Sequence, residues 1–275
     1  MSDGMKLFNR TIFERFGKAN EKRRGRTGPD SSMERLYMIG PSMNFASAEA
    51  YKLLRTNLLF SFSGSSECRI IGLTSSFSSE GKSLTSINLA YTMAEAKKNT
   101  LLIEGDMRLP TLNKRLSLKA SPGLSNLLVG MNTAGEAIQT FRATDTEDNS
   151  VAMDVLVSGD IPPNPSELLG SERMMSLLEV LRQHYDFIIL DLPPVTAVTD
   201  ALVASKLVDG MVVVVRSNHA VRGALSETIR QLRLVDTRIL GFVFNGAQEA
   251  GGGYYRRGYY KKHYKYNYYY KKDQK

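Results

Sequence analysis

Six short apolar runs, separated by segments long enough to form helices, constrain the fold more than any other feature of this sequence. The runs are RIIGLTS (69–75), TLLIEGD (100–106), MDVLVSG (153–159), FIILDL (187–192), GMVVVVRS (210–217) and RILGFVFN (238–245). Continuous apolar strands joined by helix-length crossovers are typical of a mostly parallel, twisted sheet covered by helices on both faces. Ligands of such sheets bind beyond the carboxyl ends of the strands, so we expect the functional residues to follow these runs.

A phosphate-binding loop is predicted directly after the first run, where Gly81-Lys82-Ser83 matches the end of a P-loop. In such a loop, backbone N–H groups cradle the phosphates, the lysine neutralises the β and γ oxygens and the hydroxyl reaches Mg²⁺. The strict pattern has glycine where Ser76 stands, and the tripeptide alone also fits a turn with a helix cap. Its position between an apolar strand and an amphipathic helix favours the nucleotide loop. The residues expected to bind nucleotide are Ser78, Ser79, Glu80, Gly81, Lys82, Ser83 and Leu84.

Acidic residues end two other apolar runs. Asp191 ends FIILD, where a carboxylate is costly unless it faces a cation or solvent, as a Walker B aspartate does. Glu104 and Asp106 are two residues apart, on one side of an extended chain, and Arg108 follows two residues later. A helix cap would explain one acid there but not the pair with the arginine. We therefore expect a Mg²⁺–ATP site whose metal ligands are Ser83, Asp106 and Asp191.

The formal net charge of +8 is concentrated at the two ends of the chain. Residues 251–275 have eight basic side chains and one acidic side chain, and residues 1–30 have eight basic and four acidic side chains. The net charge of residues 31–250 is therefore about −3. This pattern favours peripheral contact with anionic surfaces over specific nucleic-acid binding. We expect a basic leader (1–40), a P-loop domain (41–250) and a disordered tyrosine-rich tail (251–275). The leader fits either a flexible segment or a helix that lies on a membrane surface.

The single cysteine, Cys68, has no partner for an internal disulfide, which fits a reducing cytoplasm. The sequence shows no secretory signal, and its apolar runs are too short to span a bilayer. We therefore expect a cytoplasmic protein that reaches the membrane only peripherally.

The motifs together resemble the P-loop tyrosine kinases of bacterial capsule and exopolysaccharide systems, which are related to partitioning and septum-site ATPases. The resemblance rests on EAYKLLRTNLLFS, SSEGKS, IEGDMRLP, and GDIPPNPSELLGS followed by DFIILDLPPV, and it covers most of residues 45–245. It implies catalytic roles for Lys82, Glu104, Asp106 and Asp191, with either Glu104 or Asp106 as the base. It also implies an adenine contact from Asn245, although a turn or helix-cap role fits that residue as well.

The resemblance further implies autophosphorylation of the tail, where nine tyrosines lie among basic residues. The expected acceptors are Tyr254, Tyr255, Tyr259, Tyr260, Tyr264, Tyr266, Tyr268, Tyr269 and Tyr270. A homo-oligomeric ring, a membrane adaptor in a separate chain and a cognate tyrosine phosphatase are the implied partners. Glu49, Lys52 and Arg55 share one face of a predicted helix and are expected at the ring interface, although a solvated face with intrahelical charge pairs explains them too.

The sequence departs from the family pattern at three places, which bear on the rate of turnover and on the assembly of the ring. Ser78 and Ser79 stand where proline and glycine are usual, Glu104 replaces an aspartate, and Lys52 replaces an arginine.

Two other functions remain possible from the sequence. A partitioning-type ATPase would share the fold, but that group usually has an additional lysine early in the loop. A non-enzymatic RNA-binding or scaffold protein would explain the basic aromatic tail but not the acidic strand ends.

Overall fold

The computed structural model describes residues 43, 45–62, 67–143, 151–217 and 219–246. The predicted leader (1–40) and tail (251–275), including all nine expected acceptor tyrosines, lie outside the described residues. The structural findings below therefore concern the predicted P-loop domain. No helix within these described ranges is long and apolar enough to cross a membrane.

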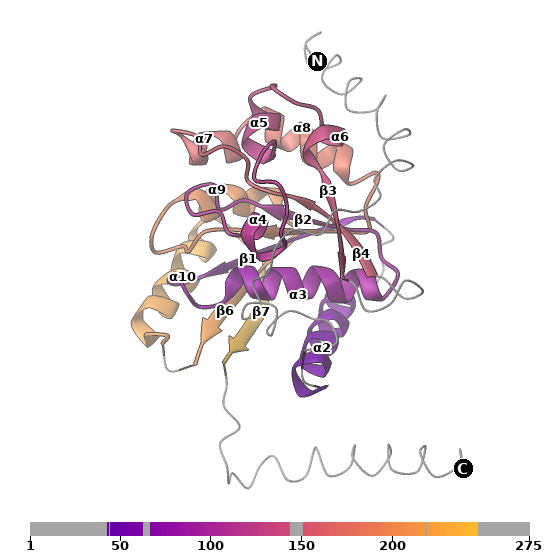
Figure 1. Ribbon diagram of the computed structural model, residues 1–275. Coiled ribbons are helices and arrows are strands. Elements are labelled where there is room, and N and C mark those ends of the chain that lie inside the picture. The colour runs from indigo at the N-terminus through magenta and orange to yellow at the C-terminus, as the bar shows by residue number, and fades with distance from the viewer. Residues whose placement is uncertain (1–42, 44, 63–66, 144–150, 218, 247–275) are drawn as a thin grey trace, which may run out of the picture. The chain divides into compact units, whose positions relative to one another are not determined.

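Seven strands form one sheet in the order β3-β4-β2-β5-β1-β6-β7 (Figure 1). Their bounds are Arg69–Ser75 (β1), Thr100–Glu104 (β2), Gln139–Ala143 (β3), Val151–Leu156 (β4), Phe187–Asp191 (β5), Gly210–Arg216 (β6) and Ile239–Asn245 (β7). All neighbouring pairs are parallel except β3 and β4. The mostly parallel sheet and its six predicted strands are confirmed. Strand β3 was not predicted, because this short antiparallel edge strand is nowhere fully buried and so lacks an apolar run.

Helices cover both faces of this sheet, as predicted. Their bounds are Phe45–Ser61 (α2), Lys82–Glu95 (α3), Leu112–Arg115 (α4), Leu124–Leu128 (α5), Ala134–Ala137 (α6), Pro165–Leu169 (α7), Glu172–Leu181 (α8), Asp200–Ala204 (α9) and Arg222–Leu234 (α10), with a 3₁₀ turn at Ser205–Leu207. One apolar core lies between the sheet and α2, α3 and α4, and the other lies beneath α5 to α10. Figure 1 shows α2 and α3 on one side of the sheet and α5 and α8 on the other.

The strand order fixes where chemistry can occur. Strand β1 lies beside β5, and β5 lies beside β2, so three parallel strands end next to one another. The register aligns Leu73 of β1 and Glu104 of β2 with Asp191 of β5. The phosphate loop after β1 and both acidic motifs therefore lie at the same edge of the sheet.

Candidate active site

Lys82 is the centre of the candidate site. It is the first residue of α3, and its ammonium Nζ lies 2.9 Å from Oδ2 of Asp106 and 3.8 Å from Oδ2 of Asp191. Burial lowers the pKa of Lys82, but the two carboxylates outweigh that effect and the net shift is upward. The lysine is therefore a fixed cation, held where phosphate oxygens are expected.

Asp191 is fully buried, and its two carboxylate oxygens differ in their contacts. Oδ1 accepts a hydrogen bond from the Ser86 hydroxyl at 3.0 Å, whereas Oδ2 has no hydrogen-bond partner within the described part of the chain. Burial raises the pKa of this carboxyl, and the charge of Lys82 and the hydroxyl of Ser83 oppose the rise. A buried carboxylate oxygen without a hydrogen bond, with the Ser83 hydroxyl close to the same carboxylate, is the kind of ligand set that Mg²⁺ accepts.

Asp106 completes the group of candidate metal ligands. Its Oδ2 accepts from Lys82, and its Oδ1 accepts from the backbone N–H of Leu109 at 3.1 Å. Both contacts orient the carboxylate toward Lys82 rather than toward solvent. Ser83, Asp106 and Asp191, the metal ligands predicted from sequence, thus gather around one lysine, and these residues fit a magnesium ion.

Side chains from within and beyond the phosphate loop fix its conformation. The buried Glu80 accepts a hydrogen bond from the N–H of Phe77 at 2.9 Å through Oε2, which closes the loop from inside. The Arg216 guanidinium, at the end of β6, donates to the carbonyl of Ser79 at 2.9 Å. Ser79 has φ of 64°, in the left-handed region that favours glycine. The loop therefore carries strain at one of the two positions where this sequence departs from the family.

Asn245 contacts the same loop. Its Nδ2 donates to the carbonyl of Glu80 at 3.0 Å, and a Cβ added to Gly81 would lie 1.9 Å from that nitrogen. Gly81 also has φ of 91°, so a side chain is excluded there by both space and conformation. The adenine contact expected from Asn245 stays a prediction, and the structure gives this side chain the separate task of holding the phosphate loop.

Glu104 does not share the surroundings of Asp106. Its carboxylate accepts hydrogen bonds from the backbone N–H groups of Thr111, Leu112 (2.8 Å) and Ser158 (3.1 Å), and the residue is almost completely buried. Burial raises the pKa of Glu104, and these three hydrogen bonds oppose the rise. Both carboxylate oxygens are thus occupied in joining β2 to the start of α4 and to the end of β4, which is a structural task, and the catalytic role expected of Glu104 stays a prediction.

Arg108 also differs from the sequence interpretation, which grouped it with Glu104 and Asp106. Its guanidinium forms two hydrogen bonds, at 2.9 and 3.0 Å, with the fully buried Asp200 at the start of α9. Asp200 also accepts from the hydroxyl of Ser166 in α7. Asp200 was not predicted as a functional residue, because it lies in none of the motifs that the sequence singled out. This cluster ties the turn that carries Asp106 to the proline-rich segment PPNPSELL.

The predicted interface helix is α2, and its charged residues contact their own chain. Nζ of Lys52 lies 3.0 Å from Oε1 of Glu49, an exposed pair one turn apart. Arg55 turns toward α3, where it donates to the carbonyl of Thr92 at 2.7 Å and lies 3.7 Å from Oε2 of Glu95. The ring interface stays a prediction, and Arg55 would reach a neighbour only by leaving these contacts.

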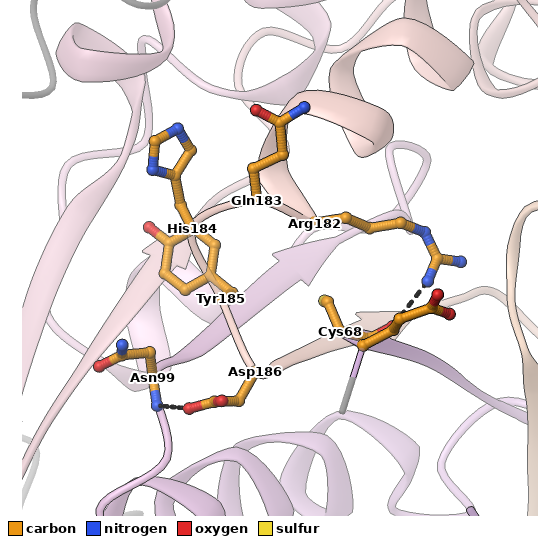
Figure 2. Close-up of a pocket in the computed structure, with 8 residues that line it drawn as sticks. Cys68, Asn99, Arg182, Gln183, His184, Tyr185 and Asp186 are labelled. Carbon is orange, nitrogen blue, oxygen red and sulfur yellow. Dashed lines mark hydrogen bonds between the residues drawn. The ribbon is translucent and has the colours of Figure 1, made fainter. Parts of the chain in front are cut away.

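A cavity of about 480 Å³ opens at the opposite edge of the sheet (Figure 2). Several of its lining residues immediately precede strands: Cys68 before β1, Asn99 before β2 and Asp186 before β5. Strands begin here, and the phosphate loop lies where they end. The buried Cys68 thiol has a pKa raised to about 11, chiefly by burial, so it is a poor nucleophile at neutral pH. Volume alone therefore does not locate the chemistry of this molecule.

Comparison with known proteins agrees with this geometry. A family model described as an AAA domain matches residues 68–240. The putative tyrosine-protein kinase CapB of Staphylococcus aureus is 35% identical over 198 residues, which cover 72% of this chain and 83% of CapB. The kinase domain of the Escherichia coli tyrosine kinase ETK matches with a TM-score of 0.72 and 30% identity, over 87% of this chain and 88% of that domain. The septum-site protein MinD of Pyrococcus horikoshii, solved with Mg-ADP, shares the fold with a TM-score of 0.52 at 21% identity.

The strand order, the GKS loop and the acidic strand ends define a P-loop NTPase-type domain. Within that class, the chain belongs to the bacterial tyrosine-protein kinases. Both predictions are confirmed, and the kinase interpretation is favoured over the partitioning or septum-site ATPase, which shares the fold alone.

Proposed function

We propose that this protein is an ATP- and Mg²⁺-dependent tyrosine autokinase. The observation that supports this most strongly is the buried group of Lys82, Asp106 and Asp191 beside the GKS loop. One cation between two carboxylates, one of which has an oxygen without a hydrogen bond, is suited to exchange its partners for phosphate and metal. Mg²⁺ would neutralise charge on the transferring phosphoryl group, with Ser83, Asp106 and Asp191 as the residues that hold it.

The protein's part in the reaction is positioning and charge neutralisation. The acceptor tyrosine oxygen attacks the γ-phosphorus, the bond to the β-phosphate bridging oxygen breaks, and the phenolic proton must leave. Lys82 and the loop amides bind the phosphates. Of the two acids that the sequence offered as base, we propose Asp106, because its carboxylate lies beside Lys82, whereas the carboxylate of Glu104 is hydrogen-bonded to backbone N–H groups only. Tyrosine has an ordinary pKa of about 10, so the proton leaves late, as the phosphoryl group arrives.

The acceptors we propose are the tail tyrosines. Glycine at 251–253 precedes them, and such a linker allows the tail to reach a site on its own or a neighbouring subunit at high effective concentration. Each phosphate adds about −1.5 to −2 charges, so four or five would cancel the tail's +7. We further propose that this charge change loosens a ring of subunits.

The biological setting follows from the family resemblance. We propose that the kinase regulates capsule or exopolysaccharide synthesis and export. It would work at the inner face of the membrane with an adaptor in a separate chain and a cognate tyrosine phosphatase. Adding the cytoplasmic tail of a co-encoded membrane protein should raise the rate of autophosphorylation. An unchanged rate at saturating concentrations would remove the adaptor from the proposal.

The decisive experiment incubates the full chain with labelled ATP and Mg²⁺ and maps the phosphorylated residues by mass spectrometry. We expect phosphotyrosine concentrated in residues 254–270, and little phosphate in a full-length variant whose nine tail tyrosines are replaced by phenylalanine. Hydrolysis of ATP without phosphotyrosine would support the partitioning-type ATPase instead. If neither ATP hydrolysis nor phosphoryl transfer is detected, even with the adaptor's cytoplasmic tail added, the result would support a non-enzymatic scaffold protein.

A further inference from the structure

The ends of β6 and β7 lie side by side next to the phosphate loop, and each ends in a residue with a hydrogen-bond donor (Figure 1). Arg216 ends β6, Asn245 ends β7, and the register pairs the two residues. The N–H of Ser217 donates to the carbonyl of Asn245 at 2.8 Å, which continues the pairing one residue past β6. Two donors therefore start from neighbouring points at the edge where the strands end.

These two side chains hold consecutive carbonyl groups of the phosphate loop. Nη1 of Arg216 donates to the carbonyl of Ser79 at 2.9 Å, and Nδ2 of Asn245 donates to the carbonyl of Glu80 at 3.0 Å. Both peptide bonds are trans and planar, so each C=O points in the direction opposite to the N–H of the next residue. The N–H of Glu80 therefore points away from Arg216. In the same way, the N–H of Gly81 points away from Asn245.

The N–H groups of Glu80 and Gly81 are open to an anion. Neither group has a hydrogen-bond acceptor among the residues that the structure describes. Successive N–H groups that precede a helix are the groups with which a P-loop binds phosphate. Holding a carbonyl on one side of the peptide thus presents the following N–H on the other side.

Arg216 acts at the point where the loop backbone is strained. Ser79 has φ of 64°, a conformation that serine adopts at a cost glycine does not have. Relaxation of Ser79 to a negative φ would rotate its carbonyl about the N–Cα bond and break the bond to Arg216. It would also change the direction of the N–H of Glu80. The guanidinium is charged, which strengthens its hydrogen bond to the carbonyl.

We propose that Arg216 is a positioning residue for nucleotide binding. By holding the carbonyl of Ser79, it keeps the loop in the conformation whose N–H groups bind the phosphates, and Asn245 does the same for the next carbonyl. The inference rests on the proposed use of this loop for ATP, but not on phosphoryl transfer to tyrosine. The competing role for Arg216 is a direct contact with the nucleotide.

The test is calorimetric titration of the full chain with Mg–ADP, together with denaturant titration of the same preparations. Arg216→Met should weaken Mg–ADP binding about tenfold, the effect of losing one hydrogen bond from a charged donor. Arg216→Lys keeps the charge and a donor but not the planar fork, so it should weaken binding only about threefold.

Arg238→Met is the matched control. Arg238 is also an exposed arginine, and it donates to the carbonyl of Ser61 at 3.0 Å. It immediately precedes β7, at the edge where strands begin. Arg238→Met should lower the free energy of unfolding as Arg216→Met does, but leave the affinity for Mg–ADP unchanged.

The Ser79→Gly background separates positioning from direct contact. Glycine keeps the left-handed conformation without help, so Arg216→Met should weaken Mg–ADP binding only about threefold in that background. A direct contact would give the same loss in both backgrounds, because the two substitutions would then be independent.

The proposal is overturned by equal losses in the two backgrounds, or by unchanged affinity in Arg216→Met. It is also overturned if Arg238→Met weakens binding equally, or if the wild-type chain does not bind Mg–ADP. The expected affinities without any phosphotyrosine formation from Mg–ATP would support Arg216 as a positioning residue and count against the proposed kinase.

Discussion

The two edges of the sheet use charged residues in opposite ways. At the edge where strands begin, Arg182 makes two hydrogen bonds with Asp209, both at 3.0 Å. It donates a third to the carbonyl of Cys68 at 2.8 Å, which Figure 2 shows. Asp209 also accepts from the N–H of Ile70. At the edge where strands end, Lys82 is shared by two carboxylates, and Oδ2 of Asp191 has no hydrogen bond within the described residues.

This difference in hydrogen bonding separates charged residues that hold the fold together from those that can bind a ligand. Charges with complete sets of partners connect elements of the fold, whereas a buried charge with an incomplete set is costly unless something else completes it. A cavity of about 480 Å³ lies at the first edge, and the carboxylate oxygen without a hydrogen bond lies at the second. The carboxylate oxygen without a hydrogen bond, and not the cavity, lies beside the GKS loop.

The largest effect on kinase activity is expected from replacing Lys82. Lys82→Met removes the cation that the phosphates and both carboxylates require, so we expect phosphotyrosine formation to fall by about 100-fold or more. The substitution also leaves the buried Asp106 and Asp191 without their shared cation, so circular dichroism must show that the variant is folded and phosphotyrosine is measured per folded molecule. Lys206→Met, which removes an exposed lysine distant from the loop in sequence, is the matched control. Wild-type phosphotyrosine in Lys82→Met would refute the assignment.

Glu104 tests whether position at the active edge suffices for a catalytic role. Glu104→Gln keeps one accepting oxygen but turns an amide NH₂ toward a backbone donor, so the free energy of unfolding should fall by about 1–3 kcal/mol. The rate per folded molecule should stay within about tenfold of wild type, which is the limit we set for a residue outside the chemistry. Denaturant titration measures the first quantity and autophosphorylation the second. An inactive variant of unchanged stability would restore Glu104 as the base.

Arg182 gives the reverse test at the opposite edge. Arg182→Met leaves Asp209 without its bidentate partner, and we expect a loss of about 1–2 kcal/mol in unfolding free energy. That value lies below the usual cost of breaking a buried pair, because the two side chains are 33% and 24% exposed. Autophosphorylation per folded molecule should not change. If Arg182→Met lowered the rate of autophosphorylation without lowering the free energy of unfolding, the edge where strands begin would be coupled to the active site.

The sequence predicted those features that depend on local pattern. Apolar runs gave six of the seven strands, and the motifs gave Lys82, Asp106 and Asp191 at one edge. The pairing of Arg108 with Asp200 was not predictable in this way, because 92 residues separate the partners and only the fold brings them together. The role of Glu104 was hidden for a similar reason. Its partners are backbone N–H groups of residues 111, 112 and 158, which leave no signature in residue type.

Ser79 offers the smallest and most local test, because it lies at the active edge but carries no charge. A residue with φ of 64° costs roughly 1 kcal/mol more as serine than as glycine, since Cβ crowds the backbone in this region. Ser79→Gly should recover part of that energy in the folded loop, although glycine also increases the entropy of the unfolded chain, so the net gain in stability stays below about 1 kcal/mol. The affinity for Mg–ATP should rise by a few-fold at most, as measured by calorimetry. The neighbouring Ser78, for which no positive φ is found, supplies the matched control: Ser78→Gly should destabilise the protein slightly. If Ser79→Gly weakened nucleotide binding instead, the left-handed serine would have a contact of its own with the nucleotide, and the departure from glycine would be functional rather than tolerated.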